Sequence, residues 1–171
     1  MGVAARAGGR LSDAPGVIRR LAGVAELAIC AKMMAESEPW LTLQRSLESS
    51  IRTLQDPDKE VYVLEDDDEI LGFVVVDLRG PFPGYLQTVC VRSGERGQGH
   101  GERLIAFAEE RIFRDSPNVF LCVSTFNPGA RRLYERLGYT VVGELSDYIV
   151  GGHGEILLRK TRGPWSAFGR R

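Results

Sequence analysis

The hydrophobic positions of this chain follow a helical spacing in some segments and form short continuous runs in others. Leu43, Leu47, Ile51 and Leu54 recur every three or four residues, which predicts an amphipathic helix over residues 42–54. Residues 24–36 are also expected to be helical. Residues 60–64 and 70–78 are apolar runs on either side of five consecutive acidic residues. This pattern predicts a β-hairpin with a charged turn.

The second half of the chain predicts alternating strands and helices. Asn127 and Pro128 are preferred residues at a helix start, and Gly138 is a typical helix stop. The predicted order of segments is a strand over 85–91, a helix from Glu102, a strand over 119–125, a helix from Asn127 to Gly138, a strand over 139–143 and a hairpin of 145–150 with 155–161. With a first strand over 17–21, this order indicates a compact unit that binds a cofactor.

Three alternating glycines, Gly97, Gly99 and Gly101, follow the strand over 85–91. Glycine lets the backbone turn tightly, and the following helix N-terminus presents unpaired N–H groups. Together they predict a cradle for an anion, most simply a pyrophosphate. Glu102 and Arg103 replace the Lys-Ser/Thr of a Walker loop, and the spacing does not fit a dinucleotide fingerprint. A strand-to-helix turn without a ligand stays an alternative.

Two segments together resemble a known enzyme family. Residues 89–91 followed by Arg-Gly-Gln-Gly-His-Gly at 96–101 resemble the acetyl-CoA motif of the Gcn5-related N-acetyltransferases (GNAT). Residues 127–139, Asn-Pro-Gly-Ala-Arg-Arg-Leu-Tyr-Glu-Arg-Leu-Gly-Tyr, are similar to the second motif of that family. The ribosomal-protein-alanine N-acetyltransferases are nearest in pattern.

The resemblance covers residues 17–161 and implies an α+β fold. It implies a single domain in which a mixed, mostly antiparallel sheet of about seven strands is flanked by about four helices. Residues 1–16 are expected to form a flexible tail, and residues 162–171 a basic C-terminal tail.

The resemblance also implies the binding site of the acetyl donor, acetyl-CoA. The pantetheine arm would lie along Val89–Val91, the loop would hold the pyrophosphate, and Asn127 would contact the donor. Tyr134 would act as general acid toward the sulfur of coenzyme A; its alternative role is a core aromatic residue. The implied donor-binding residues are Val89, Cys90, Val91, Arg96, Gly97, Gln98, Gly99, His100, Gly101, Glu102, Asn127 and Tyr134.

The sequence departs from the family where a general base is expected. The usual strand positions hold Cys122, Tyr85 and Gln87 instead of a carboxylate. Proton removal is therefore expected to run through water rather than through one dedicated group. The candidate groups that would accept the proton from this water are Glu36, Glu38, Asp147, His153 and Glu155. Each of them is also consistent with an ordinary surface or turn residue.

The acceptor groove is expected between the first two helices and the final hairpin. Glu38, Trp40 and Tyr148 are the candidate acceptor-binding residues, since a carboxylate and an aromatic face attract a cationic amine. Trp40 is equally consistent with simple helix packing. The acceptor class stays open between a protein N-terminus, a lysine and a small amine.

Composition and charge favour a small enzyme of the cytoplasm. A net charge of −1 gives no general attraction to nucleic acid, and no apolar run is long enough to span a membrane. Three cysteines without metal-ligand spacing predict reduced side chains and no metal site. The expected partner is an amine on a small molecule or peptide, and the expected state a monomer or homodimer. The alternative function is a catalytically weak module that binds or senses acetyl-CoA.

Overall fold

The computed structural model describes residues 16–169, and nearly all of the predicted N-terminal tail lies outside them. The described chain forms one seven-stranded sheet in the order β1-β2-β3-β4-β5-β7-β6, together with four α-helices. Only β4 and β5 are parallel. The predicted α+β fold is confirmed. The elements are β1 (Val17–Arg20), α1 (Gly23–Ala35), α2 (Leu47–Gln55), β2 (Lys59–Asp66), β3 (Glu69–Asp77), β4 (Tyr85–Val91), α3 (His100–Ile112), β5 (Asn118–Ser124), α4 (Pro128–Arg136), β6 (Thr140–Leu145) and β7 (Glu155–Thr161).

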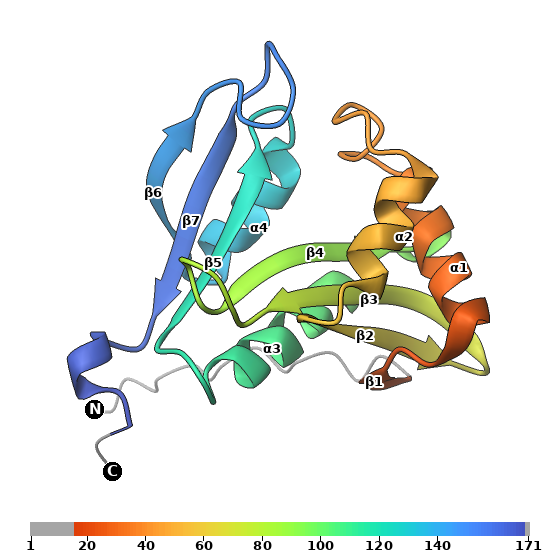
Figure 1. Ribbon diagram of the computed structural model, residues 1–171, viewed down its shortest axis with the longest axis horizontal. Coiled ribbons are helices and arrows are strands. Elements are labelled where there is room, and N and C mark those ends of the chain that lie inside the picture. The colour runs from red at the N-terminus through yellow and green to blue at the C-terminus, as the bar shows by residue number, and fades with distance from the viewer. Residues whose placement is uncertain (1–15, 170–171) are drawn as a thin grey trace, which may run out of the picture.

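The helices cover the two faces of the sheet in pairs (Figure 1). Because successive side chains of a strand point to opposite faces, β2 and β3 supply residues to two separate cores. In one core, Phe73 and Val75 pack with α1 and α2. In the other, Val74 and Val76 pack with α3, and side chains of α4 join the same cluster. The β2–β3 strands are therefore buried on both sides.

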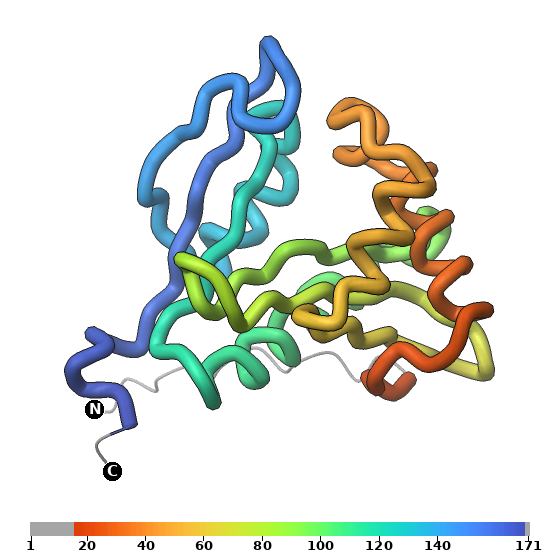
Figure 2. The backbone as a smooth tube through the Cα atoms, in the orientation of Figure 1, coloured from red at the N-terminus to blue at the C-terminus, as the bar shows by residue number. Residues whose placement is uncertain are grey.

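The sheet opens between β4 and β5. The two strands pair at a single register position, Tyr85 with Phe120, and diverge beyond it. Figure 1 and Figure 2 show β5, β6, β7 and α4 rising away from β1–β4 as a separate arm. The rest of β4 keeps β3 on one side and has no strand partner on the other within the described chain. Its free backbone groups are available to a ligand.

Three predicted boundaries were wrong. The helix predicted over 42–54 begins only at Leu47, because Ser46 caps it and Gln44 has a positive φ of 55°; Leu43 is buried from a turn. The helix predicted from Glu102 begins at His100, directly after left-handed Gly99. Residues 146–150 are turn and bend, so the final hairpin pairs β6 with β7 across a long loop.

Candidate functional site

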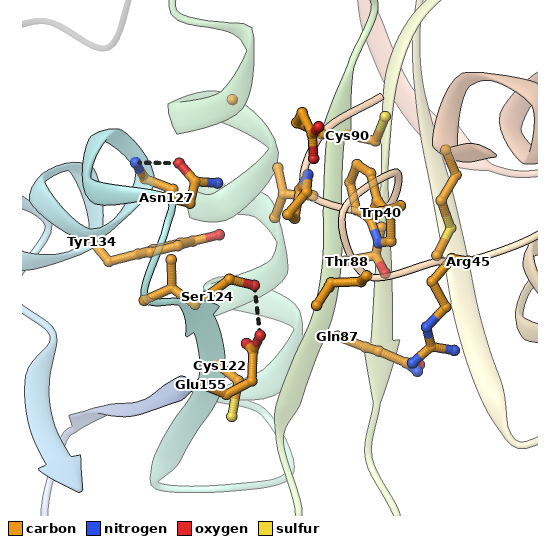
Figure 3. A pocket seen from close by; sticks show the side chains of 18 of the residues that line it. Trp40, Arg45, Gln87, Thr88, Cys90, Cys122, Ser124, Asn127, Tyr134 and Glu155 are labelled. Atoms are coloured by element: carbon orange, nitrogen blue, oxygen red, sulfur yellow. Dashed lines mark hydrogen bonds between the residues drawn. The ribbon is translucent and has the colours of Figure 1, made fainter. Parts of the chain in front are cut away.

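A cavity of about 780 Å³ lies where β4 and β5 diverge. One wall consists of residues from β5, β7 and α4, and the opposite wall consists of β4 and the α1–α2 loop (Figure 3). The β6–β7 loop contributes Tyr148 and Ile149 at the rim. The cavity therefore joins the two motifs and the predicted acceptor groove in one space.

Asn127 and Tyr134 stand on the α4 side of this cavity, as the second motif implies. Asn127 caps α4: its Oδ1 accepts a hydrogen bond of 3.2 Å from the Ala130 N–H. This cap stabilises the first turn of α4, the helix that carries Tyr134. The side-chain amide nitrogen of Asn127 donates no hydrogen bond to a described residue and is therefore available to a ligand.

The ring of Tyr134 packs against the core, whereas its hydroxyl forms no hydrogen bond with a described residue. The ring lies edge-on to Tyr139, with centroids 5.6 Å apart. Burial raises the pKa of Tyr134 to about 12. The hydroxyl is therefore protonated at neutral pH and able to donate.

The glycine loop connects β4 to α3 at the end of the cavity. Gly97 and Gly99 have positive φ values of 79° and 87°, which explains the requirement for glycine there. Of the residues predicted to bind the donor, the structure brings Val89, Cys90, Val91, Arg96, Gly101, Asn127 and Tyr134 to the cavity wall.

The other predicted donor-binding residues do not line the cavity: Gly97, Gln98, Gly99, His100 and Glu102. The first three form the loop itself at the start of α3. His100 is buried at 3% exposure, and its Nδ1 lacks a partner in the described chain. Glu102 is exposed, and its Oε1 lies 3.1 Å from Nη2 of Arg136 in an ion pair.

All three predicted acceptor-binding residues line the cavity. Glu38 is exposed and accepts hydrogen bonds from Thr42. Trp40 is half-buried against the α1–α2 core, so it packs a helix pair and faces the cavity at once. Tyr148 is 64% exposed at the rim.

The wall formed by β4 and the α1–α2 loop also carries polar residues that were not predicted to bind anything, among them Arg45 and Gln87. Arg45 lines the cavity half-buried and makes no ion pair with any described residue. Gln87 occupies a β-bulge, since its neighbours Leu86 and Thr88 pair with Val76 and Val75; its Oε1 is buried without a partner in the described part of the chain. A bulge depends on register, which the sequence pattern does not reveal.

Glu155 stands apart from the other candidate bases. It is 3% exposed, the only buried aspartate or glutamate of residues 16–169, and it lines the cavity. The Ser124 hydroxyl donates a hydrogen bond of 2.5 Å to its Oε1 (Figure 3). Burial raises the pKa of Glu155, and the Ser124 hydrogen bond partly offsets this rise.

The remaining candidate bases have other surroundings. Glu36 is exposed, and its Oε1 lies 3.8 Å from Nζ of Lys32. Asp147 is exposed and accepts a hydrogen bond of 2.6 Å from the Gly152 N–H. His153 packs edge-on to Phe126. None of these three lines the cavity.

The cysteines and the potential metal ligands of residues 16–169 could also supply chemistry. Burial raises the pKa of the Cys90 thiol to about 12 and also raises that of Cys122, so both are protonated at neutral pH and poor nucleophiles. Within residues 16–169, no group of three or more potential metal ligands comes together. In the same range, no helix has the length and hydropathy needed to cross a bilayer.

Comparison with known sequences supports what the geometry indicates. The sequence model of the acetyltransferase (GNAT) family matches residues 22–139. Acetyltransferase Atu2258 of Agrobacterium fabrum is 36% identical over 89 residues, which are 52% of this chain and 63% of that protein. Blasticidin-S acetyltransferase of Streptomyces morookaense is 31% identical over 91 residues, 49% of this chain and 67% of that protein. The chain thus spans less than two thirds of the Agrobacterium relative.

Solved structures share the fold over most of the chain. A GNAT-family acetyltransferase from Desulfovibrio desulfuricans superposes with a TM-score of 0.73 at 16% identity, covering 85% of this chain and 98% of the other. An aminoglycoside 6′-N-acetyltransferase complexed with coenzyme A superposes with a TM-score of 0.69 at 19% identity, and the match covers 86% of this chain and 98% of the other.

Ribosomal-protein-alanine N-acetyltransferase from Brucella melitensis gives a TM-score of 0.67 at 19% identity, with coverages of 85% and 99%. It is therefore one of several comparable structural neighbours. Sequence model, fold and both motifs agree, and the chain belongs to the acetyltransferase (GNAT) family, whose members use acetyl-CoA.

Proposed function

We propose that this protein is an N-acetyltransferase that moves the acetyl group of acetyl-CoA directly to a primary amine in a ternary complex. One observation carries the proposal: in the opening between β4 and β5, the Tyr134 hydroxyl, which forms no hydrogen bond with a described residue, lies opposite the edge of β4 that has no strand partner within residues 16–169. An open strand edge can bind an extended pantetheine arm, and the tyrosine can protonate a leaving thiolate.

The donor would lie along β4 from Val89 to Val91, with its pyrophosphate at the glycine loop. The left-handed glycines and the first turn of α3 present N–H groups there, and a helix N-terminus favours an anion. Arg96 lines the cavity and forms no ion pair with a described residue; its Nε donates to the Val91 carbonyl oxygen at 3.3 Å. The guanidinium therefore adds positive charge beside the loop.

The tyrosine and the strand would share the work of transfer. Backbone N–H groups on the open edge of β4 can stabilise negative charge on the acetyl oxygen as the amine attacks. The Tyr134 hydroxyl, protonated because its pKa is about 12, then gives its proton to the departing sulfur. Packing against Tyr139 holds the ring in one direction.

The acceptor would enter between the α1–α2 loop and the β6–β7 loop. Glu38 supplies negative charge and Trp40 and Tyr148 supply aromatic faces, features that suit a cationic amine. The structural neighbours have names that cite different acceptors, among them aminoglycosides and ribosomal-protein alanine. We therefore assign the amine class without choosing among protein N-termini, lysines and small amines.

A panel of amines and peptide N-termini tests the proposal, with acetyl-CoA as donor and free thiol release as the signal. Amine-dependent release, with mass spectrometry showing a single added acetyl group on nitrogen, is the expected result. Calorimetry with acetyl-CoA should be run in parallel. Tight donor binding without turnover on any amine would overturn the transferase proposal and support the alternative, a module that binds or senses acetyl-CoA.

A further inference from the structure

Glu155 is a carboxylate that the fold buries without a cation. It forms no ion pair with any described residue, and its carboxylate accepts one hydrogen bond within the described chain, from the Ser124 hydroxyl. An unpaired buried carboxylate is costly to the folded state. The hydrogen bond reaches Oε1, so Oε2 is left without a hydrogen-bond partner among the described residues, and Glu155 lines the cavity. Such an arrangement favours a functional role over a structural one.

The sheet register explains how this carboxylate reaches the site. Ser124 pairs directly with Glu155 across β5 and β7, so the two side chains share one face of the sheet. Cys122 lies two residues earlier on β5 and therefore on that same face. Burial is the main cause that raises the pKa of the Cys122 thiol, and the nearby Glu155 carboxylate raises it further. A carboxylate from β7 thus stands beside the β5 position that lacks one in the sequence.

We infer that Glu155 is the general base of this enzyme, with Ser124 as the residue that positions it. The inference rests on the proposed function and gives that site its missing proton acceptor. The amine nitrogen forms a bond to the acetyl carbonyl carbon, and the carbon–sulfur bond breaks. The proton lost by nitrogen passes to Glu155 directly or through one water, while Tyr134 gives its proton to sulfur. Exchange with solvent then restores both side chains, so the reaction is balanced.

The surroundings of Glu155 set the expected pH behaviour. The charged side chains that line the same cavity are Glu38 and Arg45 of the α1–α2 loop and Arg96 of the loop after β4, and none of them contributes to the shift of the Glu155 pKa. The titratable or polar groups that line the cavity with Glu155 from β4, β5, α4 and the β6–β7 loop are Tyr85, Gln87, Thr88, Cys90, Cys122, Ser124, Asn127, Tyr134 and Tyr148. Burial raises the pKa of Glu155 more than the Ser124 hydrogen bond lowers it. We therefore expect the carboxyl to lose its proton only at a pH above 4.5, the ordinary pKa of a glutamate.

The decisive measurement is the pH dependence of kcat/KM in wild type, Glu155→Gln and Ser124→Ala. Two acceptors should be used, an N-terminal amine of pKa about 8 and a lysine-type amine of about 10.4. In wild type, kcat/KM should rise with pH in two steps. The step at lower pH, the acidic limb, should lie at the same pH for both acceptors, whereas the second limb should follow the pKa of the acceptor amine. Glu155→Gln should lose the first limb and about 10²-fold or more in rate. Ser124→Ala should move that limb to higher pH, because the hydrogen bond that lowers the Glu155 pKa is gone.

Two further variants separate a chemical role from a structural one. Glu144→Gln removes an exposed carboxylate from the neighbouring strand β6, outside the cavity, and should leave rate and profile unchanged. Glu155→Asp keeps a carboxylate and should retain the acidic limb at a reduced rate. A profile in Glu155→Gln that keeps the acidic limb, with a loss far below the 10²-fold typical of acid–base catalysis, would overturn the inference and favour removal of the proton by water alone.

A measurement without turnover checks the buried carboxyl itself. A carboxyl whose pKa is raised in the folded state makes unfolding easier as pH rises from about 4.5 through the folded pKa. The free energy of unfolding of Glu155→Gln should lack this decrease, while Glu144→Gln should keep it. Identical pH dependence in wild type and Glu155→Gln would overturn the inference. Failure of every amine in the thiol assay would instead overturn the proposed function, whatever the unfolding data show.

Discussion

Tyr134 combines a packed ring with a hydroxyl that meets no described residue, and its neighbour Tyr139 offers a matched comparison. Tyr139 is 3% exposed and its hydroxyl is also unpartnered in the described chain, but it does not line the cavity. Tyr134→Phe should lower turnover by about 10²-fold or more, the usual scale for a lost general acid, with the acetyl-CoA Kd nearly unchanged. Tyr139→Phe should leave turnover intact. Steady-state kinetics and calorimetry measure both effects; equal turnover in the two variants would show that Tyr134 only packs.

Residue identity was easier to predict from the sequence than residue environment. Tyr134 follows from a helical spacing and a motif, both of which are local. Glu155 starts an apolar strand, and only the pairing of β7 with β5 places it against Ser124, 31 positions earlier. The sequence therefore offered Glu155 as one candidate among five, whereas burial in the folded structure distinguishes it.

The loop between β4 and α3 is the element on which donor affinity should depend most. Gly99 and Gly80 both have a φ of 87°, but Gly80 lies in the β3–β4 loop away from the cavity. Glutamate at either position carries the same left-handed strain and the same charge. Gly99→Glu should weaken acetyl-CoA binding strongly, since a side chain and a negative charge would meet the pyrophosphate. Gly80→Glu should not, and calorimetry on both variants tests this; equal affinities would contradict the placement of the pyrophosphate.

Elements with a strong local signal appear where the pattern predicts them. The hairpin of β2 and β3 turns at Asp67 and Asp68, both with positive φ, and α4 starts at its Asn127 cap. The start of α2 was wrong because Leu43 fits the helical spacing of Leu47 without belonging to the helix. A buried turn residue and a buried helix residue look alike in a hydrophobic pattern, so the Ser46 cap was the better signal.

The molecule as a whole consists of two parts of one sheet that diverge at the site. Strands β1–β4 and strands β5–β7 meet through one register pair and a bond of 3.0 Å from the Phe120 N–H to the Gly84 carbonyl oxygen. A donor bound in the opening would contact both parts, β4 on one side and α4 on the other. Its binding should therefore stabilise the fold and also reduce the motion of one part against the other.

Acetyl-CoA at 100 times its Kd should add about 2.7 kcal/mol to the free energy of unfolding. For a chain of this size that corresponds to a rise in Tm of roughly 5 to 10 °C. Hydrogen exchange should slow along β4 and in the first turn of α4, because donor contacts would cover amides that the divergence leaves open. Gly99→Glu is the control and should show neither effect at the same concentration. Protection confined to the glycine loop, with β4 unchanged, would mean that the pyrophosphate binds while the pantetheine arm lies elsewhere, and the opening between β4 and β5 would then not be where the acetyl group is transferred.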